Sequence, residues 1–279
     1  MTKQKSILIT GCSSGIGYDA AHGLKRRGWR VFATCRKPED CARLESEGLE
    51  SFPLDYTDQA SIDAAVIETL ARTNGTLNAV FNNGAFAIPG LLEDLPTDAL
   101  RSIFETNFFA QHELTRQLIP VFRQQGHGRI LMNSSILGFA ALPWRGAYNS
   151  TKFAMEGWAD TLRLELAGTN IHVVLIEPGP ITSLIRENSV PHYEQWIDAD
   201  ASPRREEYKQ QLEQRLYRPT TDKPDPFELP ASAVTTVVHD ALTLLKPKPR
   251  YRITTPTKLF AVLKRLLPTR ALDRILIKV

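Results

Sequence analysis

The chain reads Thr10-Gly11-Cys12-Ser13-Ser14-Gly15-Ile16-Gly17 directly after a short apolar run, Ser6–Thr10, and before a segment with helical periodicity. The glycines permit a tight turn, a close approach of the backbone to a pyrophosphate, and close packing of helix on strand. The N-terminus of the helix offers unpaired N–H groups and a positive dipole end to phosphate. Gly-Ser turns are common, and this spacing departs from G-x-G-x-x-G. The place of the glycines between the first expected strand and the first expected helix nevertheless predicts a dinucleotide-binding loop.

Short apolar runs and longer segments with helical periodicity alternate along the chain. The expected strands are Ser6–Thr10, Arg30–Cys35, Glu50–Leu54, Leu77–Asn82, Gly128–Ser134, Ile171–Glu177 and Arg250–Ile253. The expected helices are Gly15–Arg27, Glu39–Glu47, Gln59–Thr73, Thr97–Gln125, Ala147–Ala167 and Pro230–Leu244. Most strands are continuous Val, Ile, Leu and Phe runs, as in strands covered on both faces. This alternation predicts an α/β fold in which residues 1–279 form a single domain, with a doubly wound, parallel seven-stranded sheet in a three-layer α/β/α arrangement.

Two segments depart from this alternation. Residues 185–227 are polar, contain five prolines and a charged run, Arg204–Arg215, and follow the strand that ends at Glu177. An insertion at the carboxyl edge of such a sheet overhangs the ligand crevice, so we expect a substrate lid, with a solvated surface excursion as the alternative. Residues 257–279 are basic and amphipathic. Such a segment rests on a membrane surface, or packs against its own domain or a partner subunit.

Charge and composition exclude several classes of protein. The segment Lys246–Val279 contains ten Lys or Arg and one acid, a net charge of +9, against −6 for the remainder. Because this charge is confined to one end without a recognised motif, we do not expect nucleic-acid binding. The three cysteines and six histidines show no ligand-like spacing, so no metal site is expected. The odd cysteine count and the lack of a secretory leader favour the cytoplasm, and no window holds the roughly 18 apolar residues of a membrane span.

The end of the second expected strand distinguishes NAD from NADP. NAD enzymes of this plan place an acid there to hold the ribose 2′-hydroxyl, whereas this chain has Arg36 and Lys37 before Glu39. Two cations favour the 2′-phosphate of NADP, which Arg36 would bind, and the alternative is that they are exposed cations flanking a helix. Asp55 follows the third strand and is a candidate acceptor for the adenine amino group. Asn82 ends the fourth strand at the same edge, beside the cofactor.

A tyrosine and a lysine four residues apart open a strongly helical segment, Tyr148-Asn149-Ser150-Thr151-Lys152. This spacing puts the phenol and the ammonium on one helix face. A free phenol has a pKa near ~10, and a nearby ammonium stabilises the phenolate and moves that pKa toward neutrality. Tyr148 is therefore a candidate proton donor for carbonyl reduction and proton acceptor for alcohol oxidation. Ser135, at the end of the fifth strand, is placed to hydrogen-bond the substrate oxygen.

These motifs together resemble the short-chain dehydrogenase/reductase family over nearly the whole chain. The matching positions are Thr10–Gly17, Asn82, Asn107, Ser135, Tyr148 with Lys152, and Pro178-Gly179-Pro180-Ile181-Thr182. Within the family, the chain is similar to bacterial NADP-dependent aldehyde reductases and to retinol and 17β-hydroxysteroid dehydrogenases. One departure is Asn82-Asn83-Gly84-Ala85, where the family usually has N-N-A-G. This exchange puts a Cβ where the family usually has glycine, so it affects the backbone contacts expected after Asn82. No reacting side chain is involved.

The resemblance implies a Rossmann-like fold and a role for each matching residue. Ser135 would orient the carbonyl, Tyr148 would transfer the proton, and Lys152 would lower the tyrosine pKa and bind the nicotinamide ribose. Asn107 would hold a water molecule in the proton relay. The cofactor would further contact Gly11, Ser13, Ser14, Gly15, Ile16, Gly17, Pro178, Gly179, Ile181 and Thr182. The family also implies a homodimer or homotetramer that assembles through the helices at 97–125 and 147–167.

The residues that follow the relevant strand ends are apolar. The candidate substrate residues, which ordinary core packing would also explain, are Phe86, Ile136, Leu137, Phe139 and Trp144. We expect NADP(H)-dependent interconversion of a hydrophobic aldehyde or ketone and its alcohol. The alternatives are a non-catalytic NADP-sensing or scaffold protein on the same fold and a sugar-nucleotide epimerase on a related fold.

Overall fold

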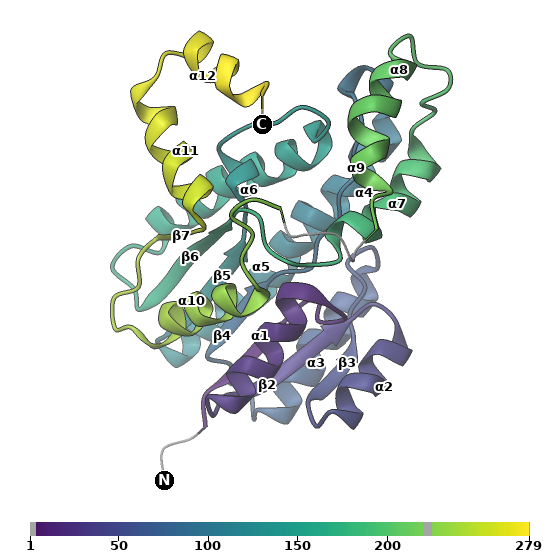
Figure 1. Ribbon diagram of the computed structural model, residues 1–279. Helices are drawn as coiled ribbons and strands as arrows, with labels where there is room; N and C mark the ends of the chain where they lie inside the picture. The colour runs from purple at the N-terminus through teal and green to yellow at the C-terminus, as the bar shows by residue number, and fades with distance from the viewer. Residues whose placement is uncertain (1–3, 220–224, 279) are drawn as a thin grey trace.

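A sheet of seven parallel strands, in the order β3-β2-β1-β4-β5-β6-β7, lies at the centre of the computed structural model (Figure 1). The model describes residues 4–219 and 225–278. The strands are β1 (Ser6–Ile9), β2 (Arg30–Cys35), β3 (Glu50–Pro53), β4 (Ala79–Asn82), β5 (Gly128–Asn133), β6 (Ile171–Pro178) and β7 (Arg250–Ile253). The strand order reverses direction at β1, between β2 and β4. The predicted doubly wound parallel sheet is therefore confirmed.

Helices cover both faces of the sheet. One face is covered by α1 (Gly15–Arg26), α2 (Pro38–Ser46) and α10 (Ala231–Thr243). The other face is covered by α3 (Gln59–Arg72), α5 (Ala110–Gln125) and α6 (Gly146–Glu165). Successive strand residues point to opposite faces, so Ile7 and Ile9 belong to one apolar cluster and Leu8 to the other. This is the predicted three-layer arrangement, visible in Figure 1.

The long helix predicted over Thr97–Gln125 is continuous but changes its winding. After a short turn, η1 (Leu92–Asp94), the helix α4 (Thr97–Phe104) passes through a π-helical segment, η2 (Glu105–Phe109), into α5. Such π-helical insertions are frequent at functional sites. The inserted segment contains Asn107, one of the predicted site residues. The helix ends at Gly126, whose φ of 78° suits glycine.

Residues 185–216 form helices that periodicity did not predict. They are α7 (Ile185–Trp196), α8 (Arg205–Glu207), the π-helical η4 (Tyr208–Glu213) and α9 (Gln214–Leu216). Buried Tyr193 and Tyr208 from these helices pack in an apolar cluster with Ile88 and Ile103, apart from the two sheet clusters. We call residues 185–216 the lid segment because they begin the range 185–227 for which a substrate lid is predicted; residues 220–224 of that range lie outside the described residues. Figure 1 shows it on the opposite side of the molecule from the two final helices.

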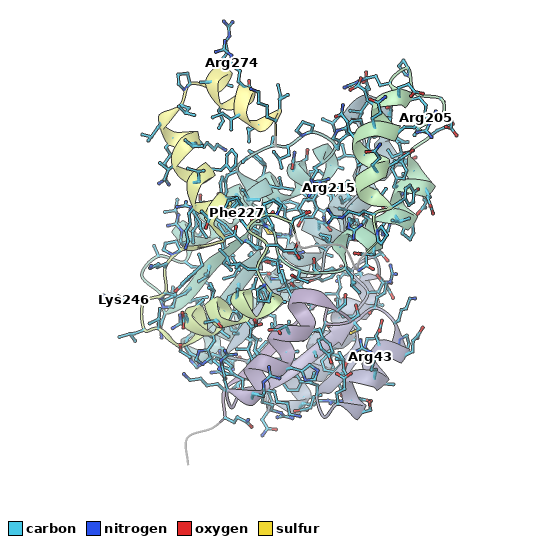
Figure 2. The ribbon with its side chains drawn as sticks, viewed as in Figure 1. Arg43, Arg205, Arg215, Phe227, Lys246 and Arg274 are labelled. Carbon is cyan, nitrogen blue, oxygen red and sulfur yellow. The ribbon has the colours of Figure 1, made fainter. Side chains whose placement is uncertain are left out.

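Two helices, α11 (Thr255–Leu266) and α12 (Thr269–Leu276), end the described chain, and we call them the tail. Phe260 and Leu276 pack against Ala140, which lies after the short turn η3 (Ile136–Gly138). Figure 2 shows Arg274 at the outer end of the tail, pointing away from the body of the protein. Within residues 4–219 and 225–278, no helix has the length and apolar character needed to cross a membrane.

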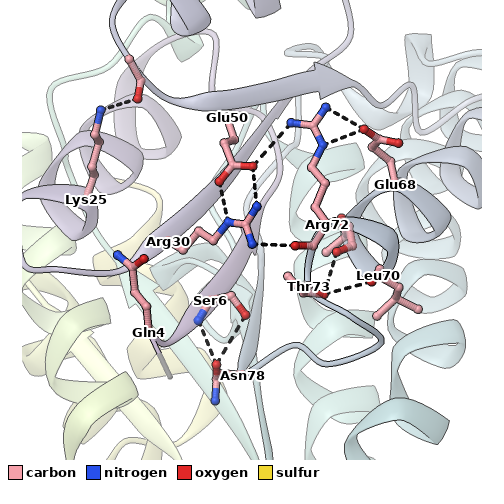
Figure 3. A network of polar contacts seen from close by, with 12 residues as sticks. Gln4, Ser6, Lys25, Arg30, Glu50, Glu68, Leu70, Arg72, Thr73 and Asn78 are labelled. Carbon is pink, nitrogen blue, oxygen red and sulfur yellow. Dashed lines mark hydrogen bonds and ion pairs between the residues drawn. The ribbon is translucent and has the colours of Figure 1, made fainter. Parts of the chain in front are cut away.

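An ion-pair network ties the amino ends of β2 and β3 to α3 (Figure 3). Arg30 Nε lies 2.6 Å from Glu50 Oε1, and the same guanidinium donates to the carbonyl of Arg72 at 2.6 Å. Arg72 in turn pairs with Glu50 at 3.5 Å and with Glu68 at 2.6 Å. These side chains are partly exposed, so each pair contributes only about 0–1 kcal/mol. The network fastens the sheet at the edge opposite to the predicted site.

The turn after β4 is built around the hydroxyl of Thr10. Thr10 Oγ1 accepts from the N–H groups of Asn83 (2.9 Å) and Gly84 (3.1 Å) and from the buried hydroxyl of Tyr56 (2.7 Å). The Tyr56 ring also fills the space beside Gly84, where an added Cβ would lie 3.0 Å from Tyr56 Cε2. Gly84, which stands where the family usually has alanine, therefore leaves room for the ring of Tyr56.

We expect Gly84→Ala to lower the free energy of unfolding by about 1 kcal/mol, because the Tyr56 ring must move to admit a methyl group. The double variant Tyr56→Val/Gly84→Ala should lose less than the sum of its two single changes, since valine vacates that space. Urea denaturation of the four proteins measures this coupling. If the losses in free energy of unfolding were strictly additive, the Tyr56 ring and the methyl group at position 84 would not compete for the same space.

Candidate active site

The glycine loop runs from the end of β1 into α1. Gly11 and Gly15 have φ values of 68° and 58°, which residues with a Cβ rarely adopt. Gly17 has no room for a side chain, because a Cβ would lie 2.2 Å from the carbonyl oxygen of Gly11. Ser14, the N-cap of α1, makes no side-chain capping bond, and the first turn contains no acid. This helix end therefore suits an anionic phosphate. The remaining predicted loop residues, Ser13 and Ile16, lie between these positions.

Two further predicted cofactor residues lie at the ends of β2 and β3. Arg36 follows β2 and is exposed. Asp55 Oδ1 accepts from the N–H (2.9 Å) and the hydroxyl (2.8 Å) of Thr57, which fixes the carboxylate at this edge. The lid segment reaches the same region through His192 of α7. Burial lowers the pKa of His192, and the positive charge of Arg36 lowers it further, which requires the two side chains to lie near each other. The cation predicted to bind the 2′-phosphate therefore lies near α7.

Two neighbouring asparagines at the end of β4 make different contacts. Asn82 is fully buried, and its Nδ2 donates to Thr115 Oγ1 on α5 at 2.9 Å. Asn83 Nδ2 donates to the carbonyls of Thr10 (3.0 Å) and Gly11 (3.1 Å). Asn83, which the motifs do not single out, thus fastens this turn to the glycine loop. The sequence feature that could have indicated this role is the position of Asn83 directly after a buried strand.

Asn107 in the π-helical segment clamps the chain that follows β4. Its Oδ1 accepts from the N–H of Phe86 at 3.0 Å, and its Nδ2 donates to the Phe86 carbonyl at 2.9 Å. The same Nδ2 lies 3.4 Å from Thr151 Oγ1 on α6. Gln111, one turn later, donates to the Gly84 carbonyl at 2.8 Å. The widened helix therefore links the β4 turn to the helix that carries Tyr148.

Tyr148, Lys152 and Ser135 lie where β5 ends and α6 begins. Lys152 is only 1% exposed, and its Nζ donates to the carbonyl of Asn133 at 2.6 Å. The same Nζ lies 5.4 Å from the centroid of the Tyr148 ring. Ser135 Oγ accepts from the N–H of Leu137 at 3.1 Å, which leaves its hydroxyl proton to donate elsewhere. A donor, a phenol and an ammonium are thus gathered at one sheet edge.

Burial shifts the pKa values of both members of the Tyr148–Lys152 pair. It raises the pKa of Tyr148 and lowers the pKa of Lys152 to about 7, and the charge of Glu156 opposes the second shift. The i, i+4 spacing alone predicts a lowered tyrosine pKa, but removal of both groups from water has the larger effect here. A neutral phenol, able to donate a proton, is favoured at neutral pH.

The P-G motif follows β6 and is held by segments from later in the chain. An added Cβ at Gly179 would lie 2.3 Å from Thr254 Oγ1, at the base of α11. Ile181 forms an isolated parallel bridge with Leu229, and the N–H of Thr182 donates to the Leu229 carbonyl at 3.0 Å. Figure 2 places the exposed Phe227 in the central region between the tail and the lid segment. No local motif indicates these partners of the P-G motif.

The five predicted substrate residues fall into separate clusters. Phe86 and Trp144 pack in the cluster that contains Tyr148 and Tyr208 of the lid segment, with Trp144 and Tyr208 ring centroids 5.0 Å apart. Ile136 and Phe139 instead pack against the tail. Leu137 is buried within η3. The structure therefore groups two of the five with Tyr148.

Comparisons with known proteins give one consistent family. The model of the short chain dehydrogenase family matches residues 5–194. The chain is 40% identical to the Uncharacterized oxidoreductase YbbO of Escherichia coli (strain K12), over 98% of this chain and 94% of that protein. It is 32% identical to the NADPH-dependent 3-dehydrocapnine reductase of Ornithobacterium rhinotracheale, over 97% of this chain and 95% of that protein.

The fold also matches solved structures. One is a short chain dehydrogenase/reductase from Burkholderia phymatum in complex with NAD, with a TM-score of 0.76 and 23% identity over 94% of this chain and 92% of that one. The family match covers more than half of the chain and includes the glycine loop and the Tyr148–Lys152 pair. The chain therefore belongs to the short-chain dehydrogenase/reductase family, oxidoreductases whose fold binds a nicotinamide cofactor.

Proposed function

We propose that this oxidoreductase uses NADP(H) to interconvert a hydrophobic aldehyde or ketone and its alcohol, with Tyr148 as general acid and base. The observation that carries the proposal is the gathering of Tyr148, Lys152 and Ser135 at the carboxyl edge of the sheet, next to the P-G motif. The cofactor supplies or accepts the hydride. The side chains of this chain orient the carbonyl and move the proton.

The proton steps follow from the positions and charges of these side chains. The Ser135 hydroxyl donates to the substrate oxygen, and the Tyr148 phenol gives its proton to the same oxygen during reduction. In the reverse direction Tyr148 must first ionise, and the Lys152 ammonium stabilises the phenolate. Because burial raises the pKa of Tyr148, neutral pH favours carbonyl reduction and higher pH favours alcohol oxidation.

Arg36 supports the choice of NADP over NAD. It is exposed at the end of β2, where a carboxylate would repel a 2′-phosphate and a guanidinium can bind it through two parallel hydrogen bonds. One full-length relative is named as NADPH-dependent. Arg36 and Lys37 precede the first acid of α2, Glu39, so no carboxylate competes at the strand end.

The substrate is proposed to be apolar around its carbonyl carbon. Phe86 and Trp144 share a cluster with Tyr148, and His192 of the lid segment stacks on Phe86 with ring centroids 4.1 Å apart. An aromatic surface beside the reacting phenol suits a hydrocarbon or ring substituent. Medium- or long-chain aldehydes, retinoids and steroid-like ketones all have this character. A panel of carbonyls and alcohols with both cofactors ranks them.

The protein is further proposed to be a cytoplasmic homodimer or homotetramer that assembles through α5 and α6. Phe109, directly before α5, and Leu164 of α6 are exposed. A hollow of about 290 Å³ lies between the two helices, lined in part by His112, Trp158 and Leu162. Exposed apolar side chains around a hollow favour burial against another surface. The predicted lid function of residues 185–227 also belongs to this proposal.

The tail is proposed to contact an anionic membrane surface. Its inner face packs on the protein through Phe260 and Ala261, whereas Leu259, Val262 and Leu266 form an exposed stripe at i, i+3 and i+7. The same part of the chain carries exposed cationic side chains, at Lys258 and Arg265 of α11, at Arg270 and Arg274 of α12, and at Lys278 after it. An anionic lipid surface complements this charge, whereas a symmetric second copy would place like charges together.

Tyr148→Phe should lower NADPH-dependent turnover of aldehydes by at least about 10²-fold while leaving NADPH binding intact, because only the proton donor is lost. Absorbance of NADPH reports turnover, and fluorescence of the bound cofactor reports binding. Tyr251→Phe, at a partly exposed tyrosine of β7 outside the proposed lid, is the matched control. Wild-type turnover in Tyr148→Phe would contradict the mechanism. NADPH binding without turnover in the wild type would support the non-catalytic alternative.

Arg36→Asp should shift the ratio of kcat/KM for NADPH over NADH by at least about tenfold toward NADH, or ~1.4 kcal/mol. The new carboxylate repels the 2′-phosphate and accepts from a 2′-hydroxyl. Initial rates with both cofactors measure the ratio. Arg123→Asp makes the same charge change on an exposed residue at the far end of α5 and should leave the ratio unchanged.

Sedimentation with lipid vesicles tests the tail. The protein should pellet with phosphatidylglycerol-containing vesicles far more than with pure phosphatidylcholine, and salt should release it. Leu259→Gln/Leu266→Gln and Lys258→Gln/Arg265→Gln should each weaken binding. Leu245→Gln, an exposed leucine outside the tail, should not. Self-association that depends on the tail leucines, without vesicle binding, would overturn the membrane assignment in favour of a second copy.

A further inference from the structure

A buried network of charged side chains lies behind the helix that carries Tyr148 and Lys152. Glu156 on α6 is 8% exposed, and Glu177 at the end of β6 is fully buried. Arg250 of β7 reaches three carboxylates, lying 3.2 Å from Glu156, 2.6 Å from Asp160 and 3.0 Å from Glu177. Arg252 pairs with the second oxygen of Glu177 at 3.0 Å. This cluster links α6 to the last two strands of the sheet.

Other charged groups lie around this cluster. Arg163 pairs with Asp160 at 3.0 Å, and burial and the charge of Glu156 raise the pKa of Glu177 to about 7. Lys152 lies one helical turn before Glu156 on the same helix, and the charge of Glu156 raises the pKa of Lys152 against the effect of burial. Lys264 of α11 also lies near this cluster. Burial lowers the pKa of Lys264, the charge of Glu156 raises it, and the ammonium lies over the Phe153 ring.

Glu156 also contacts the turn that carries Ser135. Ser134 Oγ donates to Glu156 Oε1 at 2.5 Å. Lys152 holds the preceding residue through the Asn133 carbonyl at 2.6 Å. An added Cβ at Gly138 would lie 2.9 Å from Glu156 Cγ, so this glutamate fills the space beneath η3. The two α6 side chains therefore grip successive residues at the end of β5.

We propose that Glu156 is a positioning residue for the reaction, whose carboxylate keeps Lys152 protonated and holds the strand end beside Ser135. This inference rests on the proposed function, because it assigns Glu156 an effect on the Tyr148–Lys152 pair. It extends the site one helical turn beyond the residues that touch substrate or cofactor. Asp160, which shares Arg250 but lies a further turn from Lys152, has the tethering role alone.

The direction of the expected pH effect follows from the facing groups. Burial lowers the pKa of Lys152 to about 7, and the Glu156 charge raises it. Burial raises the pKa of Glu156, while the hydrogen bond from Ser134 and the charge of Arg250 lower it toward the ionised form. Without the Glu156 charge, Lys152 loses its proton at lower pH. Tyr148 then lacks a cation beside it and ionises at higher pH, so alcohol oxidation begins at higher pH.

The test is the pH profile of kcat for alcohol oxidation with NADP in Glu156→Gln. The rising limb of this profile should move upward by about one pH unit. At a fixed pH below the limb, kcat should then be roughly tenfold lower than in the wild type. Asp160→Asn removes a carboxylate from the same arginine and should leave the limb in place. The proposal would be overturned if the rising limb of Glu156→Gln coincided with that of the wild type, or if Asp160→Asn moved the limb by the same amount.

Two further variants decide the question if Glu156→Gln does not fold. Glu156→Asp keeps the charge and should keep the wild-type limb, even where kcat falls. Ser134→Ala removes the hydrogen bond that favours the ionised carboxylate of Glu156, and it should move the rising limb of the pH profile upward by less than about one pH unit. A shifted Glu156→Asp limb or an unmoved Ser134→Ala limb would refute the inference. Absence of turnover in the wild type would instead refute the proposed function.

Discussion

A positive charge buried at Lys152 is the constraint on which the surrounding structure depends. An isolated ammonium inside a protein is costly unless its protons find acceptors and its charge finds a counter-charge. The Asn133 carbonyl is one acceptor, and Glu156 one turn away is the counter-charge. The carbonyl reaches the ammonium because β5 ends where α6 begins. The same crossing brings Tyr148 and Ser135, the groups proposed to react, to the edge of the sheet where this charge is buried.

Segments from the end of the chain complete the same edge of the sheet. Thr254, the residue directly before the tail, occupies the space that a side chain on Gly179 would need. Leu229 pairs with Ile181 from a segment between the lid and α10. The path of the P-G motif is therefore set by residues that come 48 and 75 positions later in the chain, as the numbering shows. Substitutions at the base of the tail would act on the site through packing, at a distance from the reacting atoms.

The sheet and its covering helices could be predicted because parallel strands buried on both faces are continuous apolar runs. The bounds of Arg30–Cys35 agree with β2, whereas β4 begins two residues after the predicted Leu77. There, the N–H of Ser6 donates to the side-chain Oδ1 of Asn78 at 2.8 Å, so a side-chain acceptor stands where a backbone carbonyl would continue the regular ladder. The lid helices were missed because their few buried residues, such as Tyr208, meet partners far away in the sequence.

The order of residues along the chain was enough to predict the fold class, the glycine loop and the family, since these depend on local features: a strand, a turn without side chains, a helix, and two residues four apart. The folded chain was needed to find the carboxylate whose charge acts on Lys152, the ring that packs on Gly84, and the apolar residues that share a cluster with Tyr148. Those contacts join elements that are distant along the chain. Their energies depend on burial and on neighbouring charges, and neither exists until the sheet and its helices are assembled.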